Sequence, residues 1–172
     1  FNLLKNCQHP NVIRVYDFSE FRGLHFFTME YLEGKTLHEM VHSEDVKINL
    51  DVAIGYLIQI ANGLAAVHQA KLIHRDLKPE NVLASPDGSV FKIIDFDWVH
   101  LHASNVTVML RREQKGTPGY ADPRYWNSYI CRPEMDIYSA GLVLYFIYTG
   151  KHHFYGNDEI KNYMIGDDYA YQ

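Results

Sequence analysis

Two runs of residues near the start of the chain have the pattern of β-strands. Val12–Phe18 and Leu24–Tyr31 are rich in β-branched and aromatic residues. Glu20–Gly23 lies between them and suits a turn. This order predicts an antiparallel hairpin.

The first residues carry a helical pattern that ends at a turn. Leu3, Leu4 and Cys7 lie at helical spacing, and His9-Pro10-Asn11 ends the pattern. No capping residue is visible before them in the sequence. We therefore expect the chain to begin inside a helix and to be a fragment of a larger domain.

Helical periodicity dominates the middle and the end of the chain. Thr36 can cap a short helix that reaches Ser43, and a longer amphipathic helix follows. We expect that longer helix to bury one face, formed by Leu50, Ile54, Leu57, Ala61, Leu64 and His68. Trp98–Tyr120 is irregular and polar, which predicts a long functional loop. Glu134–Tyr148 is apolar nearly all round and is closed by Gly150, so we expect a helix through the middle of a core.

A second hairpin is predicted between these helices. The turn signal Asp87-Gly88 separates two apolar runs, Asn81–Ala84 and Val90–Ile94. If the turn is centred on either of its two residues, the residue opposite Asn81 is Ile94 or Asp95.

The composition limits the classes of protein to which the chain can belong. Its 172 residues are 47% hydrophobic, enough for one globular unit with a core. Sixteen basic against 21 acidic residues give a net charge of −5, which argues against nucleic acid as a partner. Cys7 and Cys131 lie far apart and predict neither a disulfide framework nor a zinc site. Ile137–Tyr148 is too short to cross a bilayer, and no signal-peptide pattern begins the chain, so we expect a cytoplasmic protein without membrane insertion.

One motif carries chemistry. His74-Arg-Asp-Leu-Lys-Pro-Glu-Asn81 matches the catalytic loop of protein kinases at every specified position, so the sequence resembles the eukaryotic-type protein kinase family. Other landmarks of that family follow in its order: Asp95-Phe96, Gly116-Thr-Pro-Gly-Tyr-Ala-Asp-Pro123 and Asp136-Ile-Tyr-Ser-Ala-Gly141. The resemblance covers essentially the whole chain and implies an α+β, protein-kinase-like fold.

The resemblance also implies that the chain is a partial kinase domain. Residues 1–28 would end the N-terminal lobe, 29–35 would be the hinge, and 36–172 would form an incomplete, mostly helical C-terminal lobe. The family's Gly-rich loop, strand lysine and helix glutamate have no match here and would precede Phe1. Further helices of the family would follow Gln172, so we expect truncation at both ends.

The resemblance assigns roles in phosphoryl transfer, which depends on positioning and on cations near the transferred group. Asp76 would accept the proton of the substrate hydroxyl, and Lys78 would neutralise charge on the phosphate. Thr117 would touch both and help to seat the acceptor. Asn81 and Asp95 would hold Mg²⁺.

By the same resemblance, Met29-Glu-Tyr-Leu32 is the hinge that binds the adenine of ATP. Backbone groups of Glu30 and Leu32 would bond the base, Met29 would guard the back of the pocket, and Leu83 would pack under the base. Without the resemblance, Met29 and the aromatic residues of Leu24–Tyr31 would be interpreted as core residues.

A hydrophobic stack that joins the two lobes is also implied. Its members would be Leu4, Val15, His74 and Phe96, anchored by Asp136 through the backbone of the catalytic loop. His74 would then be a core residue with a satisfied ring and neither an acid nor a base. The histidines of His100-Leu-His102 and His152-His153 are expected to be solvated loop residues, because no metal-ligand pattern surrounds them.

The expected partner is a protein substrate with a serine or threonine acceptor, because the Lys78-Pro79-Glu80 form of the loop is associated with those acceptors. Arg75 precedes Asp76, an arrangement that in similar kinases binds a phosphate on the activation loop. Ser104 and Thr107 are the expected sites, modified by an upstream kinase or by trans-autophosphorylation.

Two departures from the family keep other functions open. Asp97 replaces the glycine of Asp-Phe-Gly, and Arg124 replaces the glutamate of Ala-Pro-Glu. They motivate a pseudokinase that acts as a binding or scaffold module. An enzyme of the kinase fold that acts on a small molecule is a third hypothesis, which Gly116-Thr117-Pro118 disfavours.

Overall fold

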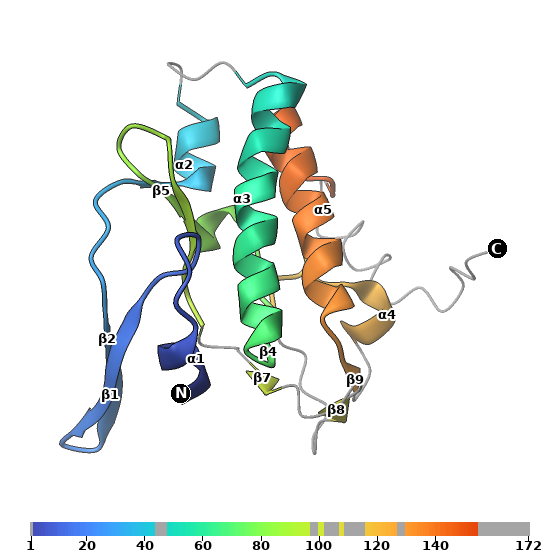
Figure 1. The fold of residues 1–172 in the computed structure, drawn as a ribbon. Helices are drawn as coiled ribbons and strands as arrows, with labels where there is room; N and C mark the ends of the chain where they lie inside the picture. Colours follow the sequence, from blue (N-terminus) through green and yellow to red (C-terminus); the bar gives the residue numbers. More distant parts are fainter. Residues whose placement is uncertain are drawn as a thin grey trace.

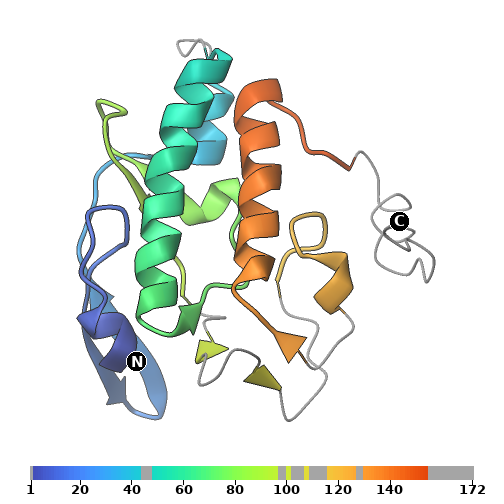
Figure 2. The same cartoon turned by 45° about the vertical axis from the view of Figure 1, so that its right-hand side comes forward.

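The computed structural model describes residues 2–43, 48–96, 100–101, 107–108, 116–126 and 130–154. Strands dominate the first part of the chain and helices the second, in an α+β arrangement (Figure 1). A hairpin extends from one side of a layer built around two long helices, and these helices lie side by side in both ribbon views (Figure 2).

The predicted N-terminal helix and hairpin are both present. Helix α1 covers Asn2–Asn6, and strands β1 (Val15–Phe21) and β2 (Leu24–Met29) pair antiparallel. Arg22 and Gly23 connect the strands, with φ of 53° and 78°, as a tight two-residue turn requires. Val12 was expected within the hairpin, but it forms an isolated parallel bridge to Ile93 instead.

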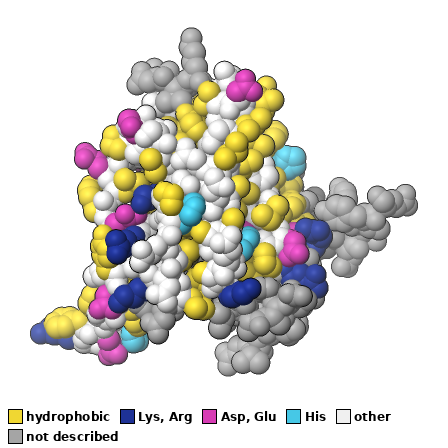
Figure 3. Space-filling view, in the orientation of Figure 1, with side chains coloured by type: hydrophobic (Ala, Val, Ile, Leu, Met, Phe, Trp, Pro, Cys, Tyr) yellow, Lys and Arg dark blue, Asp and Glu magenta, His cyan; other side chains and the backbone are white. Residues whose placement is uncertain are grey.

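The side chains of β2 are exposed, so the interpretation of Met29 and its aromatic neighbours as core residues is wrong. Phe26, Phe27 and Met29 are 44%, 39% and 47% exposed. Apolar patches accordingly appear on the hairpin side of the surface, interspersed with charged side chains (Figure 3). A two-stranded hairpin has two faces, and in the described part of the chain α1 is the element that packs closely against it.

Short elements connect the hairpin to the helical layer. Strand β3 (Lys35–Thr36) runs into helix α2 (Leu37–Val41), which begins with a capping box between Thr36 and Glu39. Strands β5 (Val82–Ala84) and β6 (Phe91–Ile93) form the predicted second hairpin, and β3 joins it in a sheet of order β3-β5-β6. Strand β4 (Leu72–Ile73) and the 3₁₀ turn η1 (Pro79–Asn81) precede β5 in the chain.

The two long helices are α3 (Leu50–Gln69) and α5 (Glu134–Thr149). Half of the face predicted for α3 is wrong, because Leu50 and Ile54 are 49% and 40% exposed and Ala61 is exposed as well. Leu64 is buried as predicted, and Leu57 and His68 are partly buried. The buried face is instead formed by Ala53, Ile60, Gly63, Leu64 and Val67. The helix is apolar on several sides, so periodicity shows that it is a helix but does not fix which side is buried.

Among the helices that the structure describes, α3 alone has the length and the apolar composition that a membrane span needs. Its buried face packs against α5 and β6, and its Gln59 binds the backbone of Ser89 and Phe91 in the second hairpin. These contacts hold one face of α3 against the rest of the described residues. Helix α5 ends as predicted, at Gly150 in the left-handed conformation with φ of 68°.

The long loop predicted for residues 98–120 contains regular structure, which corrects that prediction. Strand β7 (His100–Leu101) pairs with β4, and β8 (Thr107–Val108) pairs with β9 (Ile130–Cys131). Each strand has two residues, too few for a periodic pattern to show in the sequence. Helix α4 (Pro123–Trp126) follows at the end of the loop.

Candidate active site

The segment from His74 to Asn81 is anchored at its start by Asp136 of α5, whose side chain is fully buried. Its Oδ2 accepts the backbone N–H of His74 at 2.9 Å, and Oδ1 accepts that of Arg75 at 2.8 Å. Oδ2 also lies 2.7 Å from Nε2 of His68 on α3. A buried carboxylate with several N–H donors is well compensated, so this contact holds the segment firmly against both long helices.

His74 lies in the core with both ring nitrogens satisfied. Nε2 donates to the carbonyl of Ile94 at 3.1 Å, and Nδ1 accepts the backbone N–H of Asp76 at 3.3 Å. Its ring contacts Phe96 edge to face, with centroids 5.0 Å apart. The four side chains of the expected stack, Leu4, Val15, His74 and Phe96, are all buried.

Three polar side chains, those of Thr117, Lys78 and Asn81, converge on Asp76, which is 5% exposed. Its Oδ1 accepts the hydroxyl of Thr117 at 2.7 Å. Its Oδ2 lies 3.0 Å from Nζ of Lys78 and accepts Nδ2 of Asn81 at 3.1 Å. Lys78 also donates to the Thr117 oxygen at 2.7 Å. The structure therefore brings together the residues that the sequence motif singled out, including one that lies 41 positions away.

The register of the second hairpin places Asn81 opposite Ile94, the residue before Asp95. Val82 pairs with Ile93, and the next step of the ladder is a hydrogen bond of 2.9 Å from the Ile94 N–H to the Asn81 carbonyl. Asn81 was expected to face Ile94 or Asp95, and this prediction is confirmed. The side-chain NH₂ group of Asn81 donates to the backbone carbonyl of Asp76 and to Oδ2 of Asp76. The side-chain oxygen of Asn81, Oδ1, is therefore the atom that could ligate a cation. Asp95 adopts a φ of 62° just beyond the end of β6.

The donor chemistry of this pair fits magnesium. An amide oxygen and a carboxylate are hard ligands of the kind that Mg²⁺ prefers, and this ion usually takes one or two protein carboxylates with phosphates and water. The described residues contain no cluster of three or more His, Cys, Asp or Glu that could hold a metal by themselves. A Mg²⁺ ion held by Asn81 and Asp95 would take its remaining ligands from other groups, such as water or phosphate oxygens.

The expected hinge follows β2. Glu30 donates its N–H to the carbonyl of Arg14 at 2.8 Å, and its carboxylate accepts the Arg14 N–H at 3.0 Å and Nζ of Lys92 at 2.5 Å. These contacts tie the expected hinge to Arg14, just before β1, and to β6. Within the described residues, no backbone partner is recorded for the carbonyl of Glu30 or for Leu32. Leu83 is partly buried on β5, where it pairs with Lys92.

Comparison with known proteins decides the family. The model of the protein kinase domain matches residues 1–170. This chain belongs to the protein kinase domain family. The serine/threonine-protein kinase Nek5 of Homo sapiens is 34% identical over 157 residues, which cover 91% of this chain and 22% of that protein. The serine/threonine-protein kinase PrkC of Bacillus subtilis is 30% identical over 156 residues, covering 91% of this chain and 24% of that protein. The chain thus spans about a quarter of the length of these relatives.

The loop of the kinase domain that carries Thr117 packs closely on the segment that carries Asp76. Gly116 has a φ of 110°, and a Cβ there would lie 2.7 Å from the carbonyl oxygen of Arg75. The N–H of Tyr120 donates to the Thr117 carbonyl at 3.0 Å, and the hydroxyl of Ser139 on α5 donates to the Tyr120 carbonyl at 2.8 Å. Burial raises the pKa of the Tyr120 phenol well above its usual range, and the charge of Glu80 raises it further.

Sequence reasoning missed the partner of Arg124. It treated Arg124 only as the loss of a family glutamate, whereas the guanidinium binds the buried carboxylate of Asp122. The spacing of an acid and an arginine two residues apart was the available signal. Asp97 and Ser104 lie outside the described residues, and of Thr107 only the backbone strand is described.

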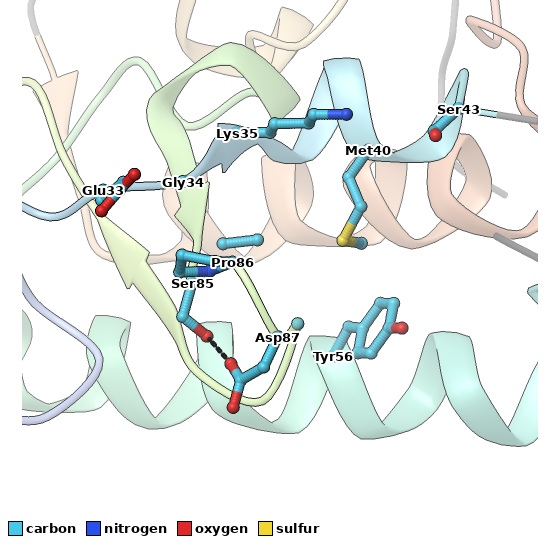
Figure 4. A pocket seen from close by; sticks show the side chains of 11 residues that line it. Glu33, Gly34, Lys35, Met40, Ser43, Tyr56, Ser85, Pro86 and Asp87 are labelled. Atoms are coloured by element: carbon cyan, nitrogen blue, oxygen red, sulfur yellow. Dashed lines mark hydrogen bonds between the residues drawn. The ribbon is translucent and has the colours of Figure 1, made fainter. Parts of the chain in front are cut away.

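Sequence reasoning also missed a cavity of about 500 Å³. It lies between the turn of the second hairpin, the segment that ends in Lys35, Met40 near the end of α2, and Tyr56 of α3 (Figure 4). Within that turn, hydrogen bonds from Ser85 and Ser89 lower the pKa of Asp87 to about 2. None of the Asp76 cluster lines this cavity, so it is distinct from the candidate active site.

His152 and His153 are exposed, as expected. His152 nevertheless has a specific partner, because its Nδ1 lies 2.9 Å from the hydroxyl of Tyr120. The side chain of His100 is not described, and His102 lies outside the described residues.

Proposed function

We propose that this domain is a serine/threonine protein kinase that transfers the γ-phosphate of ATP to a protein hydroxyl. The observation that carries the proposal is the convergence of Thr117, Lys78 and Asn81 on the buried carboxylate of Asp76. The names of the relatives, which are serine/threonine-protein kinases, support the same reaction.

In the proposed reaction, Asp76 orients the hydroxyl of the substrate and takes its proton. The hydroxyl oxygen forms a bond to the γ-phosphorus while the bond between that phosphorus and the bridging oxygen breaks, and ADP leaves with the electron pair. Lys78 lies beside Asp76 and supplies a positive charge near the transferred group. Thr117 fixes the Asp76 carboxylate and borders the seat of the acceptor.

Protein kinases use ATP with Mg²⁺, and we propose Asn81 and Asp95 as the side chains that hold the ion. When bound, the ion supplies positive charge that offsets the charge of the phosphates. Met29, Glu30, Leu32 and Leu83 are proposed to hold the adenine. The hinge contacts of Glu30 with Arg14 and Lys92 leave its backbone carbonyl available for the base.

We further propose the lobe assignment made from the sequence: residues 1–28 end the N-terminal lobe, 29–35 are the hinge and 36–172 belong to the C-terminal lobe. The exposed apolar face of β1–β2 supports a position against further strands. A cytoplasmic location, a serine or threonine acceptor on a protein, and activation by an upstream kinase or by trans-autophosphorylation complete the proposal.

The test uses the complete natural protein, purified and incubated with Mg·[γ-³²P]ATP and a generic protein acceptor such as casein. We expect label on serine or threonine. We also expect Asp76→Asn to lower the transfer rate at least 10²-fold while nucleotide affinity stays nearly unchanged, because the substitution deletes a proton acceptor and no metal ligand.

Three outcomes would contradict the proposal. Nucleotide binding with no transfer, in wild type and Asp76→Asn alike, would favour the pseudokinase module. Transfer to a small molecule but to no protein would favour the third hypothesis. Equal turnover by Asp76→Asn would refute the role of that residue.

A further inference from the structure

The Asp122 side chain is fully buried, and its charge is compensated by a residue only two positions later. Nε of Arg124 lies 2.9 Å from Oδ1 and 3.1 Å from Oδ2, and Nη2 lies 2.5 Å from Oδ2. The backbone N–H of Arg124 also donates to Oδ1, at 3.0 Å. The carboxylate thus receives both a bidentate guanidinium and a backbone cap at the start of α4.

This pair matters because burying a carboxylate without a partner costs much free energy. No other basic side chain is recorded as a partner of Asp122 within the described residues. Half of the Arg124 side chain stays exposed, so the arginine covers Asp122 without being buried itself. Loss of Arg124 would leave the carboxylate unpaired in the interior, and the local backbone would have to move to admit water.

Hydrogen bonds connect the backbone just before Asp122 to the proposed active site through Thr117. The N–H groups of Tyr120 and Ala121 both donate to the carbonyl of Thr117, at 3.0 and 3.2 Å. Thr117 in turn donates its hydroxyl hydrogen to Asp76. One turn of chain therefore connects the buried Asp122 to the oxygen that holds the proposed catalytic carboxylate.

We propose that Asp122 and Arg124 are a positioning pair that fixes Thr117 against Asp76 and so shapes the seat of the protein acceptor. The proposal rests on the proposed function. Arg124 stands where the motif of the family has the glutamate of Ala-Pro-Glu. Here Asp122 and Arg124 lie two residues apart at the start of α4, so the contact holds the chain within this one turn.

The test is a double-mutant cycle in the complete natural protein with Asp122→Asn, Arg124→Gln and the double variant. We expect Arg124→Gln to lower kcat/KM for the protein acceptor at least tenfold while KM for ATP changes less than twofold. Asp122→Asn alone should cost less, because Asn can still accept the backbone N–H. The double variant should be no worse than Arg124→Gln, since the unpaired charge is gone.

Two further variants keep the result interpretable. Lys5→Gln breaks an exposed pair with Asp17, a contact of 3.6 Å, and should leave every parameter unchanged. Arg124→Lys keeps the charge but loses the bidentate geometry, so it should fall between wild type and Arg124→Gln, and it replaces Arg124→Gln if that variant does not fold.

Hydrogen exchange separates failure of this inference from failure of the proposed function. Amides of Tyr120 and Ala121 should exchange at least tenfold faster in Arg124→Gln, whether or not the protein transfers phosphate. Unchanged exchange, or losses in the two single variants that simply multiply in the double variant, would overturn the positioning pair. A wild-type protein without transfer but with the exchange effect would overturn only the proposed function.

Discussion

The hydroxyl of Thr117 donates a hydrogen bond of 2.7 Å to Asp76 and accepts one of 2.7 Å from Lys78. The Thr117 hydroxyl therefore bonds both residues to which a role in the reaction is proposed: Asp76, which would take the proton, and Lys78, which would lie near the phosphate. This fixes the rotation of the hydroxyl and connects the loop before α4 to the segment after β4. A side chain at position 117 without a hydroxyl cannot make either contact.

We predict that Thr117→Val lowers kcat about 10- to 100-fold, because a hydrogen bond to a charged group contributes about 1.5–3 kcal/mol. Thr117→Ser retains the hydroxyl and should stay within severalfold of wild type. Thr149→Val serves as the control, since among the described residues the Thr149 hydroxyl bonds the backbone of Tyr145 and Lys151 at the end of α5, away from Asp76. Steady-state rates at saturating ATP decide the matter, and a Val variant as active as the Ser variant would contradict the role of the hydroxyl.

Asp95→Asn is predicted to weaken Mg·ATP binding, because it removes the charged oxygen proposed to ligate the ion. The loss should appear in a nucleotide titration with Mg²⁺ and shrink when Mg²⁺ is replaced by EDTA. Asp17→Asn, at an exposed position on β1, is the matched control. The same affinity for wild type and Asp95→Asn in the presence of Mg²⁺ would speak against the assignment.

The sequence was a good guide where a short pattern determines a local structure. Asp87-Gly88 predicted the turn of the second hairpin, and the resulting register brought Asn81 opposite Ile94. Thr36 and Gly150 marked the ends of helices as expected. These features depend on neighbouring residues alone, so no tertiary information is needed to find them.

Features that depend on tertiary contacts could not be predicted in the same way. Which side of α3 is buried is decided by β6 and α5, and the periodic pattern placed exposed Leu50 and Ile54 inside. The two-residue strands β7 and β8 exist only because β4 and β9 offer them partners. The Asp122–Arg124 contact depends on the burial of Asp122, which the sequence does not display.

Gly63 and Gly55 offer a direct test of packing on α3. A Cβ at Gly63 would lie 2.6 Å from the Asn11 carbonyl oxygen and 3.0 Å from Cδ1 of Ile93, whereas a Cβ at Gly55 meets nothing within 4 Å. We predict that Gly63→Ala destabilises the domain by about 1–3 kcal/mol, as overpacking does. Gly55→Ala should stabilise it by up to about 1 kcal/mol through helix propensity. Urea unfolding of both variants gives the comparison, and equal midpoints would contradict the close approach of Asn11.

Cys131 is predicted to be unreactive in the folded protein. The residue is fully buried, and burial raises the pKa of its thiol to about 11. At pH 8 the thiol is neutral, and thiolate is the reactive form. In a Cys7→Ser background, Ellman's reagent should label Cys131 only in denaturant. The pKa of the Cys131 thiol is higher in the folded protein than in the unfolded chain. The neutral thiol therefore contributes to stability up to about pH 8.5, and this contribution is lost as the pH rises towards 11. Rapid labelling of the native protein at pH 8 would refute the prediction.

Arg75 provides the last prediction, which concerns regulation. Its side chain is 6% exposed, and its Nε has no hydrogen-bond partner within the described residues. A buried guanidinium favours an anion, and a phosphate adds about −1.5 to −2 charges with strong acceptor oxygens. The family resemblance indicates Ser104 and Thr107 as the residues that would carry it.

We therefore predict that phosphatase treatment lowers kinase activity and that Ser104→Ala with Thr107→Ala has the same effect. Arg75→Gln should remove the difference between the phosphorylated and the dephosphorylated protein. Ser19→Ala, on β1, is the control for loss of a hydroxyl. Mass spectrometry of the loop accompanies each assay. Absence of loop phosphate in the active protein, or full activity of the double alanine variant, would refute phosphate binding by Arg75 as the regulatory contact.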